Sequence, residues 1–526
     1  MLSRSRALVG TVLLTLGSVM PAAADTAADW GIAFPTSQTG EAQRHFLDGV
    51  TAMHLHMFED AEAHFQAARR VAPDFAMAYW GEALNQHRAI WGYHEREKAL
   101  AVLNKLGPTS EARAAKAPTA REKAYLHAVE VLFGDGPQNR RVAAYEGAMR
   151  GITEAYPDDT EAWAWHSLSL MSATMPGMTR EQTRVQMAAD ALRVLSRNRR
   201  HPGANRYLIQ STNDTLHMPM GLIAVENLKG VTFATQSSEI LHIPSHTYLA
   251  YGMWKDAAEA NMRAFDVSMA WTKAHGWGLA DLNLHNYGHL LDYATLAYLQ
   301  TGQFSKVAAL ERRVMSDYEA SGKAAEIRRY MSTVHARSMV ERQAVDSARS
   351  LAALARRDGI PDQTLWLGIG VTAARANDLA LAREALEKLQ RGGGETKAPA
   401  LKVKGLIAMA EGQQARGVEL LGEAAGLEAK EPSARVGLPP PVALAAELYG
   451  QALVDAGRPQ EALKQFESAL AFYRRTTNLL LGAAKASQQA GQPDRAAAYA
   501  RDLLDVLREA DAGHPFLSQA RQIASR

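Results

Sequence analysis

The chain has 526 residues, a formal net charge of +2 and no cysteine. This length allows a large core or several domains. The lack of cysteine excludes disulfides and thiolate metal sites, and the nearly neutral charge gives no indication of nucleic-acid binding.

The first 24 residues are predicted to form a secretory signal peptide. Arg4 and Arg6 precede an apolar run from Ala7 to Met20, and a small-residue site ends at Ala24, after which we expect cleavage. No later segment has 18 consecutive apolar residues, so we expect no membrane insertion after cleavage. Together with an Ala-, Arg- and Gly-rich composition, this predicts an exported bacterial protein, either periplasmic or secreted.

Small and aromatic residues recur at fixed offsets after the signal peptide. Gly49 lies twelve residues before Ala61, which is followed by Phe65, Ala68 and Pro73. Small residues let two antiparallel helices approach, an aromatic ring fills the groove between them, and a proline ends the second helix. The offsets return, with substitutions, in four further sets: Ser245, Tyr248, Ala257, Asn261 and Ala264; Gly405, Gly417, Leu421 and Ala424; Gly450, Ala462, Phe466 and Ala469; and Ala484, Ala496, Ala500 and Leu503.

This pattern resembles the tetratricopeptide repeat (TPR), whose period of 34 residues separates Ala462 from Ala496. The resemblance is specific at 42–75 and 443–510 and weaker between them. No alternating strand pattern of any length accompanies it. We therefore predict an all-α protein, an α-solenoid of TPR-like helix pairs.

Gly- and Pro-rich breaks at 104–122, 391–399 and 431–441 divide the chain. We expect an N-terminal TPR-like region at 25–122, a histidine-rich TPR-like region at 123–310 and a C-terminal TPR array at 311–526. Stacked repeats share one continuous core, so these regions are not expected to be independent domains.

Histidines are concentrated in the middle region, and six of them are candidate metal ligands. Three precede a proline by one or two residues, which places them at helix entrances, where the helix dipole disfavours imidazolium and favours the neutral imidazole that a metal needs. Two pairs are spaced i, i+4: His242 with His246, and His285 with His289. The candidates, in order of preference, are His242, His246, His285 and His289, followed by His201 and His217.

A structural role remains an alternative for each of these histidines. A histidine at a helix entrance can simply cap backbone N–H groups. In the TPR frame, moreover, His246 and His289 differ by two helical turns in their distance from the following interhelix turn, an axial offset of about 10 Å. Unless the helices slide or tilt, the two pairs need not meet at one ion.

The middle region also resembles a family of bacterial TPR proteins with histidine signatures of the type HPGA, H-[MI]-P-S-H and H-N-x-x-H. The matching segments are "HPGANRYLIQSTNDTLHMP", "LHIPSHTYLAYG" and "LHNYGHLLDYA". Two family histidines are replaced here, by Arg206 and Gln210. Neither replacement keeps an imidazole, and Arg206 adds a fixed positive charge near any cation. The resemblance implies a site, but it implies no reaction.

Copper, zinc and iron all suit imidazole ligands. Three carboxylates near the histidines, Asp214, Asp281 and Asp292, could complete a ligand shell or orient a ligand. In the alternative interpretation, Asp214 belongs to a turn and Asp281 is an N-terminal helix charge. The neighbouring tryptophans Trp254, Trp271 and Trp277 are expected to pack between helices rather than to form a ligand cage.

Three functions are compatible with this sequence. The first is an exported TPR scaffold with a histidine-based metal site on the inner face of its middle repeats and a protein or peptide partner in its groove. The second is an interaction scaffold whose histidines are structural. The third is a metal-dependent hydrolase or oxidase on the same scaffold. No residue pattern identifies a catalytic group, so enzymatic activity stays open.

Overall fold

The computed structural model describes residues 25–231, 235–282, 287–391, 397–430 and 437–525. Over this part of the chain the protein is helical, apart from a hairpin of two short antiparallel strands, β1 (His87–Arg88) and β2 (Tyr93–His94). The all-α prediction is therefore confirmed. The predicted signal peptide lies outside the described residues.

The first half of the chain forms the helices α1 to α15. They are α1 (Ala27–Trp30), α2 (Gly40–His54), α3 (Phe58–Val71), α4 (Ala76–Leu84), α5 (Arg96–Leu106), α6 (Ser110–Ala114), α7 (Ala120–Phe133), α8 (Gln138–Ala155), α9 (Thr160–Ser169), α10 (Arg180–Arg197), α11 (Pro202–Ser211), α12 (Met218–Lys229), α13 (Ser238–His242), α14 (Pro244–Tyr251) and α15 (Trp254–Ala274). Two 3₁₀ turns, η1 (Ala89–Trp91) and η2 (Leu279–Asp281), lie beside them.

The second half continues in the same way. Its helices are α16 (His289–Gln300), α17 (Phe304–Ala320), α18 (Ala325–Arg342), α19 (Val345–Asp358), α20 (Gln363–Arg375), α21 (Leu379–Arg391), α22 (Lys397–Ala410), α23 (Gln414–Glu428), α24 (Ala445–Asp455), α25 (Pro459–Phe472), α26 (Thr477–Gln489), α27 (Pro493–Val506) and α28 (Pro515–Ala524), with the 3₁₀ turn η5 (Leu507–Glu509) before the last.

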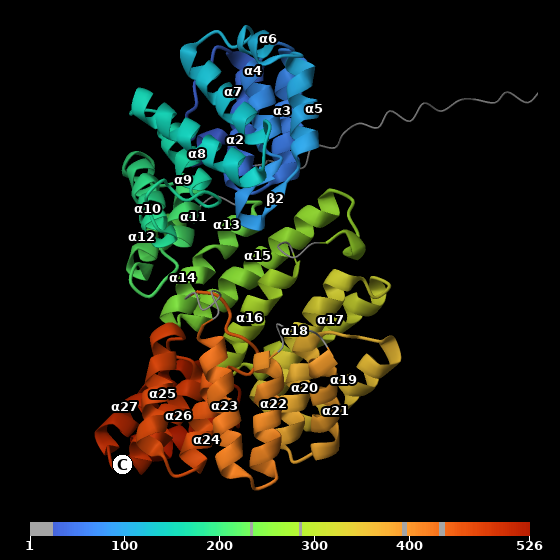
Figure 1. The fold of residues 1–526 in the computed structure, drawn as a ribbon, viewed down its shortest axis with the longest axis vertical. Coiled ribbons are helices and arrows are strands. Elements are labelled where there is room, and N and C mark those ends of the chain that lie inside the picture. The colour runs from blue at the N-terminus through green and yellow to red at the C-terminus, as the bar shows by residue number, and fades with distance from the viewer. Residues whose placement is uncertain (1–24, 232–234, 283–286, 392–396, 431–436, 526) are drawn as a thin grey trace, which may run out of the picture.

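Successive helices pack against each other, and alternate helices also touch. Helix α20 contacts α21 and α22, and α22 contacts α23 and α24. This pattern of neighbours is that of a stacked solenoid, which runs from the N-terminal helices at one end of Figure 1 to the C-terminal helices at the other.

The helix contacts follow the predicted TPR frame. Phe65 of α3 is fully buried between α2 and α4. A Cβ atom added at Gly49 or Gly81 would lie 2.7 or 2.3 Å from the Phe65 ring. The aromatic ring therefore fills the space beside Gly49, as the offsets predicted, and also the space beside Gly81.

The buried apolar side chains of the described residues gather mainly in two clusters. One runs from Ala27 to Ile243, and the other from Ala264 to Ala486. Of the expected region boundaries, the one after residue 122 falls inside α7 and the one after residue 310 falls inside α17. The break expected at 104–122 contains the short helix α6.

The C-terminal repeats fold back onto the middle of the chain. The Trp254 indole donates a hydrogen bond to the Arg475 carbonyl at 2.9 Å, and the Gln300 side chain accepts one from the Thr477 amide at 2.8 Å. A third buried cluster joins side chains of α14–α16 to side chains of α26–α28. Segments more than 170 residues apart in the sequence are therefore in direct contact.

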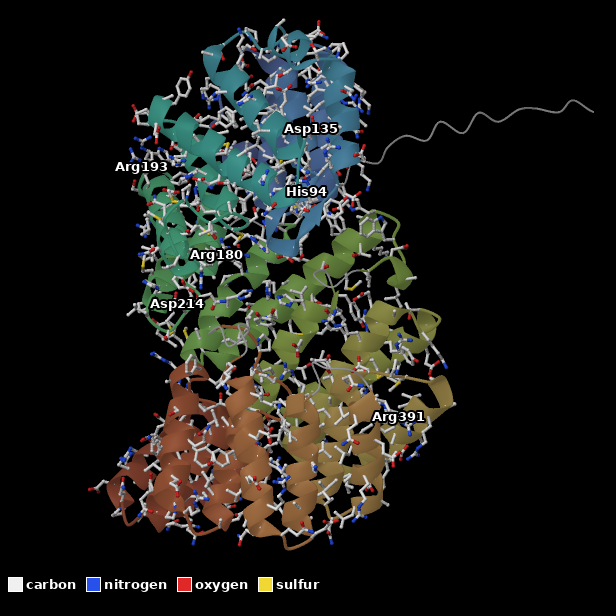
Figure 2. All side chains as sticks on the ribbon, in the orientation of Figure 1. His94, Asp135, Arg180, Arg193, Asp214 and Arg391 are labelled. Carbon is white, nitrogen blue, oxygen red and sulfur yellow. The ribbon has the colours of Figure 1, made fainter. Side chains whose placement is uncertain are left out.

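Charged side chains are spread over the surface, from Asp135 and Arg193 among the N-terminal helices to Arg391 among the helices of the second half (Figure 2). Among the described residues, no helix has both the length and the apolar character needed to cross a membrane.

Candidate metal centre

Three of the predicted ligands meet in the second half of the histidine-rich region. His242, His246 and His289 each offer a ring nitrogen, and these nitrogens lie within 4.8 Å of one another. The ring centroids of His242 and His289 are 4.6 Å apart, and those of His242 and His246 are 5.2 Å apart. The axial offset expected from the TPR frame thus does not separate His246 from His289.

The local sequence explains how the three rings converge. Ser237 caps α13 by accepting the Ile240 amide, so His242 lies at the end of this short helix. Pro244 begins α14 after the single residue Ile243, and His246 lies in its first turn as predicted. His289 is the first residue of α16. A π-helical turn at Tyr287 and Gly288 precedes it and shifts its position along the helix.

Asn261 of α15 fixes the protonated nitrogen of His242. Its side-chain N–H groups donate to Ser245 Oγ and to the Ala257 carbonyl, both at 2.7 Å. Its oxygen therefore faces His242 Nδ1, at 2.7 Å, and can only accept. The proton of a neutral His242 is thus on Nδ1, and Nε2 carries a lone pair. That Nε2 is buried and has no hydrogen-bond partner among the described residues.

His246 is oriented in the same way by a tyrosine. The Tyr293 hydroxyl donates to the Gly437 carbonyl at 3.1 Å, so it accepts from His246 Nδ1 at 3.3 Å. The Nε2 atom of His246 is then the unprotonated one. In metal sites, a ligating histidine typically donates its other ring N–H to such a supporting acceptor.

Burial keeps these imidazoles neutral. Burial lowers the pKa of His242, although Glu239 and the hydrogen bond with Asn261 raise it in part. Burial lowers the pKa of His246 further, and its neighbour His242 adds to this effect. Neutral imidazole is the form that binds a transition metal.

Arg206, which replaces a family histidine, lies close enough to affect both histidines. It contributes to the lowered pKa of His242 and of His246. The side chain is 3% exposed, and its Nη2 donates to Glu239 Oε2 at 2.8 Å. Its positive charge is therefore balanced by a carboxylate from α13 itself.

The three candidate carboxylates have other partners. Asp292 accepts hydrogen bonds from the Arg337 guanidinium, and Asp281 accepts one from the Gly278 amide at 2.8 Å. Asp214 accepts from the amides of Leu216 and His217, as expected of a turn residue. None of the three belongs to the group around His242.

The remaining predicted ligands are placed elsewhere. His217 is the residue before α12 and contacts the Asp214 carboxylate through Nδ1 at 2.9 Å, outside the group around His242. His285 lies outside the described residues. The second family replacement, Gln210, offers its backbone carbonyl to Arg184 at 3.2 Å.

His201 lies in a second group, with His54 and Glu161. The HPGA segment builds it: His201 caps α11 by accepting the Ala204 amide on Nδ1 at 3.1 Å, and Pro202 occupies the first helical position. Gly203 admits His54, since an added Cβ would lie 2.3 Å from the His54 ring. Glu161 lies between the two histidines, 2.9 Å from His54 Nε2 and 3.2 Å from His201 Nε2.

The hydrogen bonds of this second group leave no nitrogen free for a metal on His201. Because Nδ1 of His201 accepts the Ala204 amide, its proton is on Nε2 and is donated to Glu161. Burial alone would raise the pKa of Glu161, but His201 and His54 lower it to about 2. The group is a satisfied buried network around a carboxylate. Spacing gave no sign of it, because Glu161 is 107 residues from His54 and 40 from His201.

No protein-family model and no curated protein matches this sequence. Three solved structures are similar to it over most of their length. The human IFIT1 dimer with m7Gppp-AAAA has 12% identity, covers 92% of this chain and 93% of its own, and has a TM-score of 0.32. Yeast Tom70 has 13% identity, with 92% and 95% covered and a TM-score of 0.29. The P58(IPK) TPR domain has 13% identity, with 92% and 99% covered and a TM-score of 0.20.

With TM-scores this low, the fold assignment rests on the helix pairs of the chain itself. The stacked neighbours and the aromatic contact of Phe65 are those of TPR-like pairs. The protein is thus an all-α solenoid of TPR-like helix pairs.

Proposed function

We propose that this protein is an exported scaffold that holds one transition-metal ion between His242, His246 and His289. The observation that carries the proposal is the buried Nε2 of His242. It has a lone pair, no partner among the described residues, and a ring orientation fixed by Asn261. An unsatisfied buried acceptor costs about 1–3 kcal/mol, which a bound ion would offset.

The ligand set favours zinc or copper over iron. Three imidazoles form the group, and no carboxylate joins them among the described residues. Non-haem iron sites typically combine two histidines with a carboxylate, whereas zinc and copper are commonly bound by imidazoles alone. Iron remains the third choice.

Two cavities support a protein or peptide partner in the groove. One, of about 530 Å³, is lined by residues of α20, α22 and α24, including Arg375, Met409 and Gln451. A second, of about 310 Å³, shares Arg375 and Gln451 and extends to Lys485 of α26. Alternate helices thus form one continuous hollowed face, the kind of surface on which repeat proteins hold extended partners.

The number of ligands favours metal-dependent hydrolysis as a second candidate function. Three protein ligands leave the fourth position of a tetrahedral zinc ion open, as in catalytic sites. Enzymatic activity would add to the scaffold role rather than replace it.

Metal analysis tests the proposal. The untagged protein, stripped with chelator, is incubated with zinc or copper, dialysed and analysed for bound metal. We expect about one ion per chain and its loss in the His246→Ala/His289→Ala variant. The matched control is His45→Ala/His64→Ala, because these two rings also approach each other, with their Nδ1 atoms 3.4 Å apart. Retention of metal in the first variant, or its loss in the control, would contradict the proposed site.

A further inference from the structure

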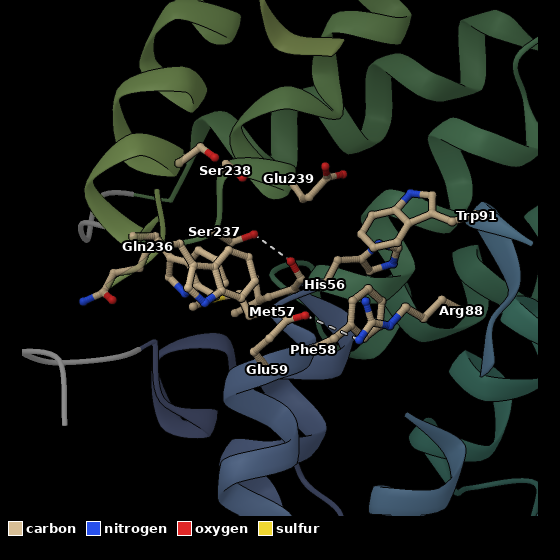
Figure 3. Close-up of a pocket in the computed structure, with 14 residues that line it drawn as sticks. His56, Met57, Phe58, Glu59, Arg88, Trp91, Gln236, Ser237, Ser238 and Glu239 are labelled. Carbon is tan, nitrogen blue, oxygen red and sulfur yellow. Dashed lines mark hydrogen bonds and ion pairs between the residues drawn. The ribbon is translucent and has the colours of Figure 1, made fainter. Parts of the chain in front are cut away.

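A cavity of about 60 Å³ lies where the N-terminal helices meet α13 and α15 (Figure 3). Its walls come from four separate parts of the chain: residues 55–59, Arg88 with Trp91, residues 236–239, and the end of α15 with the residues that follow it. A water molecule needs about 10–15 Å³ of such volume, so the cavity has room for a group of about four or five heavy atoms.

Three tryptophans line this cavity. Trp91, Trp271 and Trp277 are all half-buried, whereas Trp30, Trp80, Trp165 and Trp366 are completely buried in the core. Trp254 also lies in the core, as expected of a packing residue. Trp271 and Trp277, in contrast, leave ring surface for a ligand. Convergent half-exposed aromatic rings are typical of binding pockets.

The aromatic walls are held in place by the protein. The Trp271 indole donates to Asp60 Oδ2 at 2.8 Å, and its ring centroid lies 5.1 Å from that of Trp277 at an angle of 85°. On the other side, Trp91 meets the edge of Phe58 with centroids 5.1 Å apart. A pocket with fixed walls loses little conformational entropy when a ligand binds.

The lining combines ring faces, which attract a cation, with charged side chains that are already paired. Glu59 and Glu239 line it from α3 and from α13, as Figure 3 shows, against one guanidinium, that of Arg88. Arg88 lies over the Phe58 ring, 4.3 Å from its centroid, and within 3.5 Å of Glu59. The partner of Glu239 is Arg206, which does not line the cavity. Each lining carboxylate therefore has a guanidinium partner, and the attraction for a cation comes mainly from the electron-rich ring faces.

We propose that this pocket binds an alkylammonium group. The ring faces of Trp91, Trp271 and Trp277 surround the cation, and Glu59, whose ion pair with Arg88 is the longer of the two, is the carboxylate available beside it. The group belongs either to a small free amine or to a lysine side chain of a protein partner. Both present the same chemistry to the pocket, and the site is separate from the three-histidine group.

Calorimetric titration of the full chain tests this proposal. The probes are choline and its neutral isostere 3,3-dimethylbutan-1-ol, and Nα-acetyl-lysine methylamide with the matching norleucine amide. We expect at least one ammonium probe to bind about tenfold or more tightly than its neutral counterpart. Binding of choline alone assigns a free amine, and binding of the lysine amide alone assigns a partner side chain.

Variants locate the binding. Trp271→Leu should weaken ammonium binding about tenfold, and Glu59→Gln should weaken it by a smaller factor. The control Trp163→Leu should leave it unchanged, because Trp163 is also half-buried but lies under Arg193 outside the pocket. Trp277→Leu replaces Trp271→Leu if thermal unfolding shows that the latter is misfolded. Equal binding of charged and neutral probes, binding of neither ammonium, or binding unaffected by the pocket variants would overturn the proposal.

Discussion

Asn261 decides which nitrogen of His242 is available to a metal. Its amide is locked by two donated hydrogen bonds, so its oxygen must face the His242 ring. A rotated amide would place an N–H group against Nδ1 and move the imidazole proton to Nε2. The side chain is completely buried, where such a polar residue is costly unless its hydrogen bonds are made.

Replacement of Asn261 is therefore predicted to weaken metal binding without removing a ligand. In Asn261→Leu, His242 loses the acceptor for its Nδ1 proton, and affinity should fall about 10–100-fold. Asn261→Asp keeps an acceptor and should retain most of the affinity. Competition titrations against a chelating dye measure both variants. Equal affinity of Asn261→Leu and the unmodified protein would show that the orientation of His242 does not depend on this residue.

The buried histidines should make the metal-free protein sensitive to acid. Burial lowers the pKa of His242 and of His246, while the unfolded chain titrates near 6.5. Below this pH the unfolded state binds more protons than the folded state, so stability falls as pH falls. His242→Gln/His246→Gln should flatten the decline in thermal midpoint between pH 7.5 and 5. An unchanged pH profile in this variant would contradict the neutral state assigned to these rings.

The pKa of His166 is shifted in the opposite direction from those of His242 and His246. Burial alone would lower its pKa, but hydrogen bonds with Asp190 and Glu146 raise it to about 9. Its contribution to stability is complete below about pH 6.5 and is lost as the pH rises through 9. The acid sensitivity predicted above therefore cannot arise from this histidine.

At the scale of the helix pair, Asn261 occupies a position that is aromatic elsewhere in the solenoid. It follows Ala257 by the same four residues by which Phe65 follows Ala61 and Phe466 follows Ala462. Ser245 occupies the position that Gly49 has in the first pair, and its Oγ accepts a hydrogen bond from the Asn261 side chain. One repeat thus replaces an aromatic–glycine contact with a polar contact that supports His242.

The aromatic–glycine contact of Phe466 should contribute to stability and not to metal binding. Phe466 is buried between Gly450 and Gly482, where an added Cβ would lie 2.6 or 2.4 Å from its ring. Phe466→Ala should cost about 3–5 kcal/mol in urea unfolding and leave metal affinity unchanged. Phe472→Ala is the control, because this side chain is 41% exposed, and it should cost less than about 1 kcal/mol. Similar costs for the two variants would contradict the assigned packing.

The offsets of small and aromatic residues were sufficient to predict helix pairs and the all-α solenoid. They were not sufficient to place His289 beside His242. The frame assumed equivalent straight helices, whereas a break at Ile243 separates α13 from α14 and a π-helical turn precedes His289. The position of His201 before Pro202 is compatible with helix capping, but nothing in the sequence indicates that Glu161 is its partner. That contact depends on which helices pack together, and nothing in the local spacing encodes it.

At the scale of the whole molecule, the return of the C-terminal repeats supports the histidine site. Gly437 accepts the Tyr293 hydroxyl, and Tyr293 contacts His246. Near the same interface, Gly252 has a φ of +66° and approaches the Arg474 carbonyl so closely that an added Cβ would lie 2.6 Å from it. Contact between the C-terminal repeats and the middle of the chain depends on curvature accumulated over many repeats, so the sequence did not predict it.

Gly252→Ala should weaken the contact between the C-terminal repeats and α14–α16. Gly276→Ala is a matched control, since Gly276 has a φ of +70° but open space around its Cβ position. Both variants incur the strain of a left-handed residue, and only Gly252→Ala adds a backbone clash, which should cost about 1–3 kcal/mol more. Hydrogen exchange should then rise in α26–α28, which pack on the middle repeats. Equal exchange in the two variants would contradict the proposed role of this contact.

The most direct test of the central claim is anomalous diffraction from crystals of the protein loaded with zinc or copper, recorded at the absorption edge of that metal. We predict one strong peak about 2.0–2.1 Å from Nε2 of His242, from Nε2 of His246 and from a ring nitrogen of His289. A peak at the His54–Glu161–His201 group instead, or no peak between the three histidines, would contradict the account.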